Sequence, residues 1–284
     1  MSVLIRLRDY RNLPAAEHEV QKFILKNPKE ILDMTVYEVA EKTYTSPATV
    51  VRLCKRIGVK GFNKFKIELS SEVKSFDNLH LELLDSTSIQ KEDSSKEIVD
   101  KITNIAIESI EETRLLLDLN SLNQAVTWIS QSTIMDFYGV GASNIVAMDA
   151  LYKFMRVGKT CASYSLYDRQ YVQAVNSNTM HIGLVFSYSG ETKEMIEIAE
   201  MLRKNGTNVI AITNSTSNTL SKIADINLTV STRETVFRSG AMASRTSSLY
   251  IVDLLYAMYC SCDYEHASEM IQLTRITNDK TNSC

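Results

Sequence analysis

The 284-residue sequence has no long hydrophobic run. Its longest apolar stretches are strand-sized, whereas a helix that spans a bilayer needs about 20 apolar residues in succession. The first residues, MSVLIRLRDYRN, interrupt their apolar side chains with charges and lack the apolar core of a secretory signal. Hydrophobic residues make up 44% of the chain and charged residues 23%, as in ordinary globular proteins. We expect a cytoplasmic protein with no membrane segment.

Paired cysteines are also missing. The chain has five cysteines, an odd number, scattered along its length: Cys54, Cys161, Cys260, Cys262 and Cys284. No C-x-x-C pair or Cys/His cluster has the spacing of a zinc site. Cys260 and Cys262 form a C-x-C, but two ligands do not make a metal site. We predict reduced, unligated thiols, with no metal and no cofactor.

Acidic residues are absent from one stretch near the amino terminus. Residues 42–67, KTYTSPATVVRLCKRIGVKGFNKFKI, contain seven basic residues and no acidic one. Residues 1–75 carry 14 Lys and Arg against 9 Asp and Glu, and the remaining residues carry 17 against 25. A head of net charge +5 on a body of −8 is a pattern found in proteins that bind nucleic acids.

Two short helices are predicted inside this head. Thr35 is a cap for a helix in TVYEVAEKT, a short turn follows at Tyr44 and Thr45, and Ser46 begins a second helix. Pro47 suits the first helical position, and Gly58 ends the helix. The apolar face of the second helix is formed by Val50, Leu53, Cys54 and Ile57, and its cations lie opposite. Amphipathic helices are also predicted within residues 13–28 and 61–76.

This pattern predicts a helix-turn-helix DNA-binding domain over residues 1–77. Its second helix enters the major groove and reads bases from its N-terminal residues. The predicted base contacts are Ser46, Ala48, Thr49 and Arg52. The predicted phosphate contacts, which set affinity and register, are Lys55, Arg56, Lys60 and Lys64. The alternative is a solvated basic helix on a small helical bundle.

A linker and a connecting helix are predicted over residues 78–117. Residues 77–96, DNLHLELLDSTSIQKEDSSK, are rich in polar residues in their second half and show no periodic apolar face there. A helix is expected at about 97–119. It docks either on the second domain or on a partner subunit, and the sequence leaves both open.

The acidic body, residues 118–284, alternates strands with helices. Strands are predicted at residues 133–140, 161–165, 180–187, 208–215 and 225–231. Helices are predicted between them, including residues 193–206, and a long helix at about 240–260 follows. Such alternation predicts an α/β fold in which helices cover both faces of a doubly wound, mostly parallel five-stranded sheet. Ligands of these sheets bind beyond the carboxyl ends of the strands.

Two of these strands lead into helices through polar, glycine-containing loops, GVGAS (139–143) and SYSGET (187–192). Neither loop has the glycine pattern of a dinucleotide fingerprint or of a Walker loop. A hydrolase elbow needs GxSxG, but the order here is SxSG, and no histidine is placed to act as its base. Three hydroxyl groups at a helix start do suit an anion, because the free N–H groups there add to the hydroxyl donors. The alternative is simple helix capping by Ser189.

The body resembles a SIS (sugar isomerase) domain, a phosphosugar-binding doubly wound fold. The stretches that carry this resemblance are GVGAS, FSYSGETKE, VIAITNSTSNTLSKIADINL and RSGAMASRTSSLYIVDLL. The head, with TSPATVVRLCKRIGVKGFNKFKIEL, resembles the RpiR/MurR family of bacterial transcriptional regulators, which join this helix-turn-helix to a SIS domain.

The resemblance implies a homodimer or tetramer that binds a double-stranded operator and regulates sugar-phosphate or amino-sugar genes in response to a phosphosugar. By motif position it implies Ser143, Ser187, Ser189 and Thr192 as the phosphosugar site. One stretch, YDRQYVQA (167–174), departs from the family because it has no histidine before Gln170. We expect that loop to face the ligand, so the sugar specificity of a relative does not transfer.

An isomerase or lyase with an accessory DNA-binding head is the competing interpretation. Those reactions need a general base beside the substrate. Glu234 is the best carboxylate for this purpose, but a contact with ligand hydroxyls is the interpretation we prefer for it. None of the four histidines completes an acid–base pair with it, so we predict no catalytic residue. A scaffold with an empty pocket would not need Ser187, Ser189 and Thr192 together.

Overall fold

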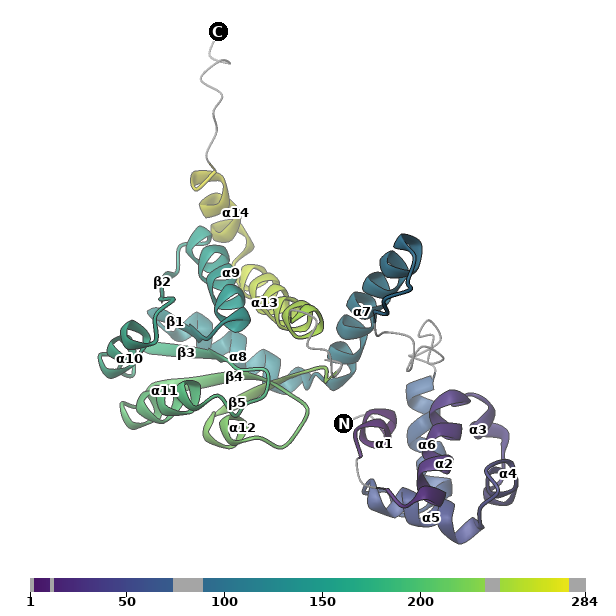
Figure 1. Ribbon diagram of the computed structural model, residues 1–284. Coiled ribbons are helices and arrows are strands. Elements are labelled where there is room, and N and C mark those ends of the chain that lie inside the picture. Colours follow the sequence, from purple (N-terminus) through teal and green to yellow (C-terminus); the bar gives the residue numbers. More distant parts are fainter. Residues whose placement is uncertain (1–2, 11–12, 74–88, 233–240, 276–284) are drawn as a thin grey trace. The chain divides into compact units, whose positions relative to one another are not determined.

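The computed structural model describes residues 3–10, 13–73, 89–232 and 241–275, and the chain divides into two compact units, Met1–Asp93 and Ser94–Cys284 (Figure 1). Each unit has its own hydrophobic core and is described by itself. No helix in the described ranges is long and apolar enough to cross a bilayer.

The first unit is helical. Its described helices are α1 (Val3–Asp9), α2 (Ala15–Lys26), α3 (Glu30–Asp33), α4 (Val36–Lys42), α5 (Pro47–Arg56) and α6 (Phe62–Val73). The caps expected from the sequence are present: Thr35 forms a capping box with Glu38, and the Ser46 hydroxyl accepts a hydrogen bond from the Thr49 N–H. These bonds satisfy N–H groups that the first turn of a helix leaves open, so they fix where α4 and α5 begin.

The core of this unit lies where α2, α4, α5 and α6 meet. It includes Val20 and Ile24 of α2, Val39 of α4, Val50 and Leu53 of α5, and Phe65 and Leu69 of α6, all fully buried. The apolar face predicted for the second helix of the pair is therefore the face that packs. Lys66 of α6 donates hydrogen bonds to the carbonyl groups of Leu32 and Met34, so this cation holds α3 in place.

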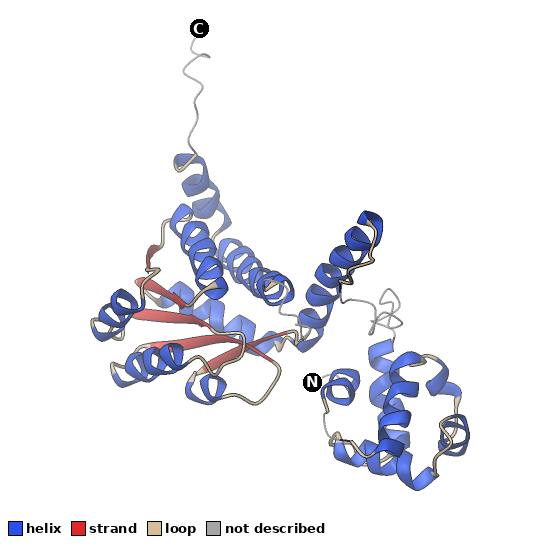
Figure 2. Cartoon of the chain, viewed as in Figure 1, coloured by secondary structure: helices blue, strands red, loops and turns tan. Residues whose placement is uncertain are grey.

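The second unit is built on a five-stranded sheet in which every pairing is parallel (Figure 2). Its strands are β1 (Ile134–Gly139), β2 (Thr160–Ser163), β3 (His181–Phe186), β4 (Asn208–Asn214) and β5 (Ile226–Val230), in the order β2-β1-β3-β4-β5. Its helices are α7 (Ser95–Leu116), α8 (Leu119–Gln131), α9 (Ala142–Arg156), α10 (Tyr167–Val175), α11 (Lys193–Lys204), α12 (Thr219–Ile223), α13 (Met242–Cys262) and α14 (Tyr264–Leu273). The predicted fold class is confirmed.

Helices cover both faces of this sheet. Side chains of α8, α9 and α13 pack with Met135, Phe137 and Leu184 on one face, and those of α10, α11 and α12 pack with Tyr138 and Val185 on the other. Because successive strand residues point to opposite faces, a strand between two helical layers must be apolar throughout. This requirement explains why the predicted strands are nearly continuous apolar runs.

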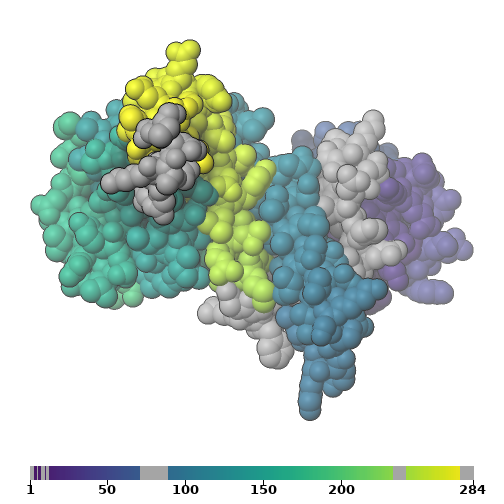
Figure 3. Space-filling model, turned by 90° about the horizontal axis from the view of Figure 1, so that it is seen from above, coloured from purple at the N-terminus to yellow at the C-terminus, as the bar shows by residue number. Residues whose placement is uncertain are grey.

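Helix α7 packs against the other elements of the second unit, one of the two docking partners that the sequence left open. The Ser231 N–H, just after β5, donates a hydrogen bond to Thr113 Oγ1, and Ser247 Oγ of α13 donates to the Ser109 carbonyl. Figure 3 shows α7 and α13 lying side by side along this contact. The domain boundaries 1–77, 78–117 and 118–284 remain predictions.

Phe154 of α9 is the centre of an aromatic cluster in the second unit. Its ring is fully buried, and ring centroids lie 6.1 Å away in Phe137, 5.9 Å in Tyr256 and 5.6 Å in Tyr259. We expect Phe154→Ala to lower the free energy of unfolding by about 3–5 kcal/mol, because the cavity loses these contacts.

Urea unfolding followed by the fluorescence of Trp128, the single tryptophan, reports on the second unit alone, because Trp128 packs against the same core. Tyr264→Ala, at a side chain that is 74% exposed, is the control and is expected to change the free energy by less than about 0.5 kcal/mol. An unchanged urea midpoint for Phe154→Ala would contradict the importance of the cluster.

Candidate functional site

The strand order creates one special place at the carboxyl edge of the sheet. The chain leaves β1 through α9 on one face and leaves β3 through α11 on the other, while β1 and β3 are neighbours. This is the topological switch point, where open α/β sheets bind their ligands. Gly139 at the end of β1 is in register with Phe186 at the end of β3, so the loops 139–143 and 187–192 start side by side.

Loop 187–192 presents its three hydroxyl groups in different ways. Ser187 is buried and donates a 3.0 Å hydrogen bond to Thr192 Oγ1, whereas Ser189 is exposed and accepts a bond from the Glu191 N–H. Helix α11 begins at Lys193 with Thr192 as its N-cap residue. The alternative in which Ser189 caps this helix is therefore wrong, because Ser189 lies three residues too early and its hydroxyl serves the turn.

Gly190 and Asn218 hold the shape of this loop. Gly190 has φ +66°, and a β-carbon there would lie 2.0 Å from Asn218 Oδ1. The Leu220 N–H donates to the Gly190 carbonyl, and Thr219 donates to the Glu191 carboxylate through its N–H and its hydroxyl. These Thr219 hydrogen bonds lower the pKa of Glu191, so its carboxylate stays ionised and tied to α12.

The loop after β1 is braced by Gln170, a side chain whose role sequence reasoning missed. Gln170 is fully buried on α10, its Oε1 accepts from the Gly139 N–H, and its Nε2 donates to the Gly139 and Tyr164 carbonyl groups. A β-carbon on Gly139 would lie 2.7 Å from the backbone of Ser143. The first turn of α9, with the half-buried Ser143, is thereby held close to the strand end.

Residues 167–174 were expected to begin as a loop before a helix at Tyr171, and the loop assignment is wrong because the helix already begins at Tyr167. They form the greater part of α10, where Gln170 points inward to the end of β1. Asp168 lies in the first turn and accepts a hydrogen bond from the Arg169 N–H. The structural role in this stretch therefore belongs to the side-chain amide of Gln170, which binds the backbone of Gly139 and Tyr164.

Of the helices that start at this edge, α9, α10 and α11 lack side-chain caps, whereas α12 has one. No side chain caps α9, α10 or α11, whereas Asp118, Asn218 and Asp263 cap α8, α12 and α14 with hydrogen bonds. An uncapped N-terminus keeps N–H groups and a partial positive charge available to a ligand. The ends of α9 and α11 therefore offer N–H donors beside Ser143, Ser187 and Thr192, which suits a phosphate group.

The structure assembles no acid–base pair at this edge from the residues it describes. His181 is the first residue of β3, at the opposite edge of the sheet, where its Nδ1 lies 2.7 Å from Asp136 Oδ2. Glu234, predicted to contact the ligand, lies outside the described residues. Within the described ranges no three His, Cys, Asp or Glu side chains could share a metal ion. Burial raises the pKa of both Cys54 and Cys161 to about 12, so these thiols stay protonated.

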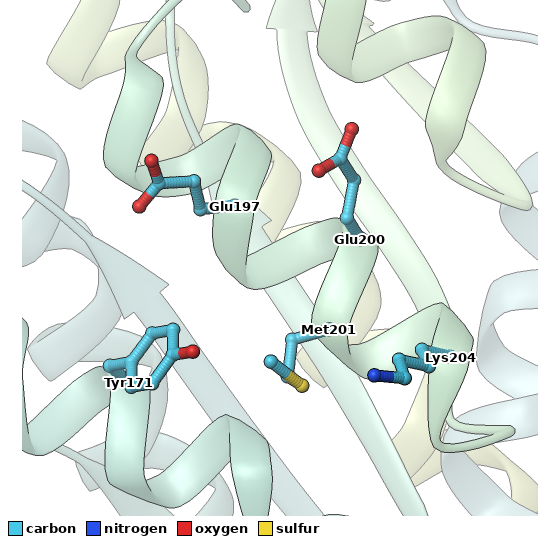
Figure 4. A pocket seen from close by; sticks show the side chains of 5 residues that line it. All are labelled: Tyr171, Glu197, Glu200, Met201 and Lys204. Atoms are coloured by element: carbon cyan, nitrogen blue, oxygen red, sulfur yellow. The ribbon is translucent and has the colours of Figure 1, made fainter.

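A shallow hollow lies elsewhere, between α10 and α11 (Figure 4). Tyr171 of α10 lines it together with Glu197, Glu200, Met201 and Lys204 of α11. Two carboxylates against one ammonium group make it unsuitable for an anion. The hollow contains none of the predicted site residues.

The predicted DNA-reading residues lie on and after α5. Ser46, Ala48, Arg52, Lys55, Arg56, Lys60 and Lys64 are exposed. Thr49 is different, because it is 4% exposed and its Oγ1 accepts a hydrogen bond from Arg52 and lies 3.0 Å from Ser46 Oγ. Its side chain is placed to orient Arg52 and does not itself reach outward.

An acidic side chain from outside the acid-free stretch, Glu17 of α2, lies beside two of its arginines. It is 2% exposed, with its Oε2 2.7 Å from Arg56 Nε and its Oε1 3.7 Å from Arg52 Nε. A buried carboxylate needs compensating charge, so these two arginines neutralise Glu17 while Glu17 restrains them. The sequence gives no local signal for this contact, since Glu17 lies more than thirty residues before Arg52.

Comparison with known proteins finds two known domain families in the chain. A helix-turn-helix domain of the rpiR family matches residues 1–76, and a SIS domain matches residues 129–258. An uncharacterized HTH-type transcriptional regulator of Caldanaerobacter subterraneus subsp. tengcongensis is 34% identical over 93% of this chain and 94% of its own.

Solved structures also resemble the chain. The NanR protein of Vibrio vulnificus, complexed with ManNAc-6P, has a TM-score of 0.60 and 28% identity over 96% of both chains. The sugar isomerase domain of an RpiR transcription factor from Sphaerobacter thermophilus has a TM-score of 0.58 and 17% identity over 62% of this chain and 97% of its own. The second likeness bears on the fold alone.

Gly190→Ala tests the shape of loop 187–192. We expect it to abolish phosphosugar binding, because the new β-carbon collides with Asn218 and strains a left-handed backbone. The measurement is a thermal-shift screen against hexose 6-phosphates, in which binding raises the unfolding temperature. Gly206→Ala is the matched control, since it strains φ +76° at the other end of α11. A thermal shift retained by Gly190→Ala would show that this loop does not hold the phosphate.

Glu17→Gln tests the restraint on the arginines. We expect tighter binding to random duplex DNA and a smaller ratio of operator to random affinity, because released guanidinium groups bind phosphates of any sequence. The logarithmic salt slope should steepen by about one. Anisotropy titrations with a duplex obtained by binding-site enrichment and with a random duplex give both quantities. Glu19→Gln, at an exposed residue of α2, adds the same charge; equal behaviour of the two variants would refute the restraint.

Proposed function

We propose that this chain is a sensor of a phosphosugar. It belongs to the family of HTH-type transcriptional regulators that join an rpiR-family helix-turn-helix domain to a SIS domain. Its operator affinity would change when the phosphosugar binds in the SIS domain. The regulated genes would serve sugar-phosphate or amino-sugar metabolism, and the protein would act in the cytoplasm.

The observation that carries this proposal is the pair of loops at the β1/β3 switch point. Ser187 and Thr192 supply hydroxyl groups, and the uncapped ends of α9 and α11 supply N–H donors. In our proposal Ser143, Ser187, Ser189 and Thr192 hold the phosphate, and Glu234 contacts the hydroxyl groups of the sugar. The likeness to a NanR protein complexed with ManNAc-6P supports this assignment and makes ManNAc-6P the first ligand to try.

The DNA-binding part of the proposal rests on α5. Ser46, Ala48 and Arg52 would contact bases, and Lys55, Arg56, Lys60 and Lys64 would contact phosphates of a double-stranded operator. Thr49, predicted as a base contact, would instead act by orienting Arg52, because its hydroxyl accepts a hydrogen bond from that guanidinium. Exposed cations around a capped helix in a family of DNA-binding regulators support these roles.

We favour a sensor over an enzyme. An isomerase or lyase needs a base next to the substrate, and the carboxylate that the described part of loop 187–192 contains, Glu191, is engaged by two hydrogen bonds from Thr219. Relatives named as transcriptional regulators support the same choice. The isomerase stays the second candidate, and Glu234 would be its base.

Self-association is part of the proposal. Two reading heads are needed to contact half-sites related by a two-fold axis. Helix α9 supports it with an exposed apolar stripe at the spacing of helix pairing: Ile145, Met148, Tyr152 and Met155. We propose a homodimer or tetramer in which this stripe is covered by a second copy.

Thr192→Val tests the coupling between ligand and DNA. In wild type we expect the phosphosugar found in the screen to change operator affinity about 5- to 150-fold, the range of typical coupling energies. Thr192→Val loses a hydroxyl of the site, so its operator affinity should no longer respond, while its affinity without ligand should stay the same. Thr127→Val, at an exposed threonine of α8, should respond as wild type does.

The measurement is operator affinity with and without ligand for the three proteins, after circular dichroism has shown that each is folded. A full response by Thr192→Val would mean that the phosphate binds elsewhere. A wild-type operator affinity that ignores every bound phosphosugar would end the sensor proposal. Steady turnover of a sugar phosphate that Glu234→Gln abolishes would instead establish the isomerase.

A further inference from the structure

The turn between α4 and α5 carries an unusual tyrosine. Tyr44 is 98% exposed, and its backbone has φ +52°, in the left-handed region that residues other than glycine seldom adopt. Ala241 is the other described non-glycine residue with positive φ. A large apolar ring is therefore held in water on a backbone that disfavours it.

The backbone conformation at Tyr44 ends helix α4. The Tyr44 N–H donates to the Glu41 carbonyl, and the Thr45 N–H donates to the Ala40 carbonyl at 2.8 Å. This pattern closes a helix with one left-handed residue, which is usually glycine because glycine has no β-carbon to strain. Helices α5, α9 and α11 follow the rule with Gly58, Gly158 and Gly206. Among these four helix ends, the end of α4 is the one whose left-handed residue is not glycine but Tyr44.

The Tyr44 side chain contributes nothing to the fold that the structure describes. With 98% of the residue in solvent it buries almost no apolar area, and no hydrogen bond or ring contact of its side chain is found among the described residues. Glycine would relieve the strain without removing a contact. A strained, exposed side chain that the fold does not need is best explained by a function outside the fold.

The position of Tyr44 indicates what that function is. It lies two residues before Ser46, the cap of α5, and the exposed Ala48 and Arg52 follow on that helix. The second helix of such a pair enters the major groove with its N-terminal end, so the turn before it meets the sugar-phosphate backbone at the edge of the groove. A tyrosine hydroxyl is among the neutral donors that bind DNA phosphates.

We propose that Tyr44 binds duplex DNA by donating a hydrogen bond from its Oη to a backbone phosphate, which fixes how α5 is seated in the groove. The inference rests on the proposed DNA-binding function and adds to it a neutral contact that charge patterning does not reveal. A base contact is less suited to this residue, because base edges face α5 itself.

Tyr44→Phe and Tyr44→Gly in the full-length protein test this contact. We expect Tyr44→Phe to weaken binding about 10-fold for enriched operator and random duplex alike, since a phosphate contact carries no sequence information. The logarithmic salt slope should not change, because no charge is lost. Lys64→Ala should also weaken both duplexes but flatten the slope by about one.

Tyr44→Gly should bind DNA at least as weakly as Tyr44→Phe and yet unfold at the same or a higher temperature, because the strain is relieved. A residue that merely stabilised the fold would show the opposite temperature change. Tyr264→Phe, at an exposed tyrosine of the other unit, should bind DNA as wild type does.

Each other outcome overturns the proposal in a recognisable way. Wild-type affinity in Tyr44→Phe shows that the hydroxyl makes no contact. A loss confined to the operator identifies a base reader, and a lower unfolding temperature in Tyr44→Gly with normal DNA binding identifies a structural residue. If wild-type protein binds no duplex DNA at all, the proposed function fails first, and the Tyr44 contact fails with it.

Discussion

The parallel pairing of β1 with β3 is the constraint on which the second unit depends. These strands are far apart in the sequence, and their register places the ends Gly139 and Phe186 opposite each other. The loop that leads into α9 and the loop 187–192 start side by side because of that register. The left-handed Gly190 then lets the second loop pass close to Asn218, where a side chain would collide. A polar, ligand-ready edge is thus a consequence of how an apolar sheet is aligned.

In the first unit the main constraint is the ion pairing of Glu17 with two arginines. Arg52 and Arg56, which we propose bind DNA, each have their Nε within 3.7 Å of the Glu17 carboxylate of α2. The carboxylate is almost completely buried, so it acts over a short distance in a medium that screens it weakly. Thr49 adds a hydrogen bond to Arg52 from the same helix. The neutral Thr49 and the acidic Glu17 thus restrain the orientation of the arginine side chains of α5.

Much of this architecture could be predicted from local sequence. Continuous apolar runs identified the five strands, and Ser46 with Pro47 identified the start of α5, because strand burial and helix capping are set by neighbouring residues. Helix α8 was not predicted, although Leu122, Ala125, Val126 and Ile129 form its buried stripe, since many polar residues separate them. The contacts of Gln170 with Gly139 and of Glu17 with Arg56 could not be predicted, because they join residues about thirty or more positions apart. Periodicity contains no information about such pairs.

The place where helix α7 is bonded to the rest of the second unit determines how far its free end would move if it rotated. The hydrogen bond from the Ser231 N–H to Thr113 anchors its last turns just beyond β5, at the carboxyl edge of the sheet. Its 22 residues make a rod about 33 Å long, whose other end, Ser95, directly follows the first residue of the second unit in the sequence. Rotation of such a rod by about 5° around the anchored end moves the far end by about 3 Å, as lever geometry requires. A rotation too small to disturb the sheet would thereby be enlarged at the start of α7.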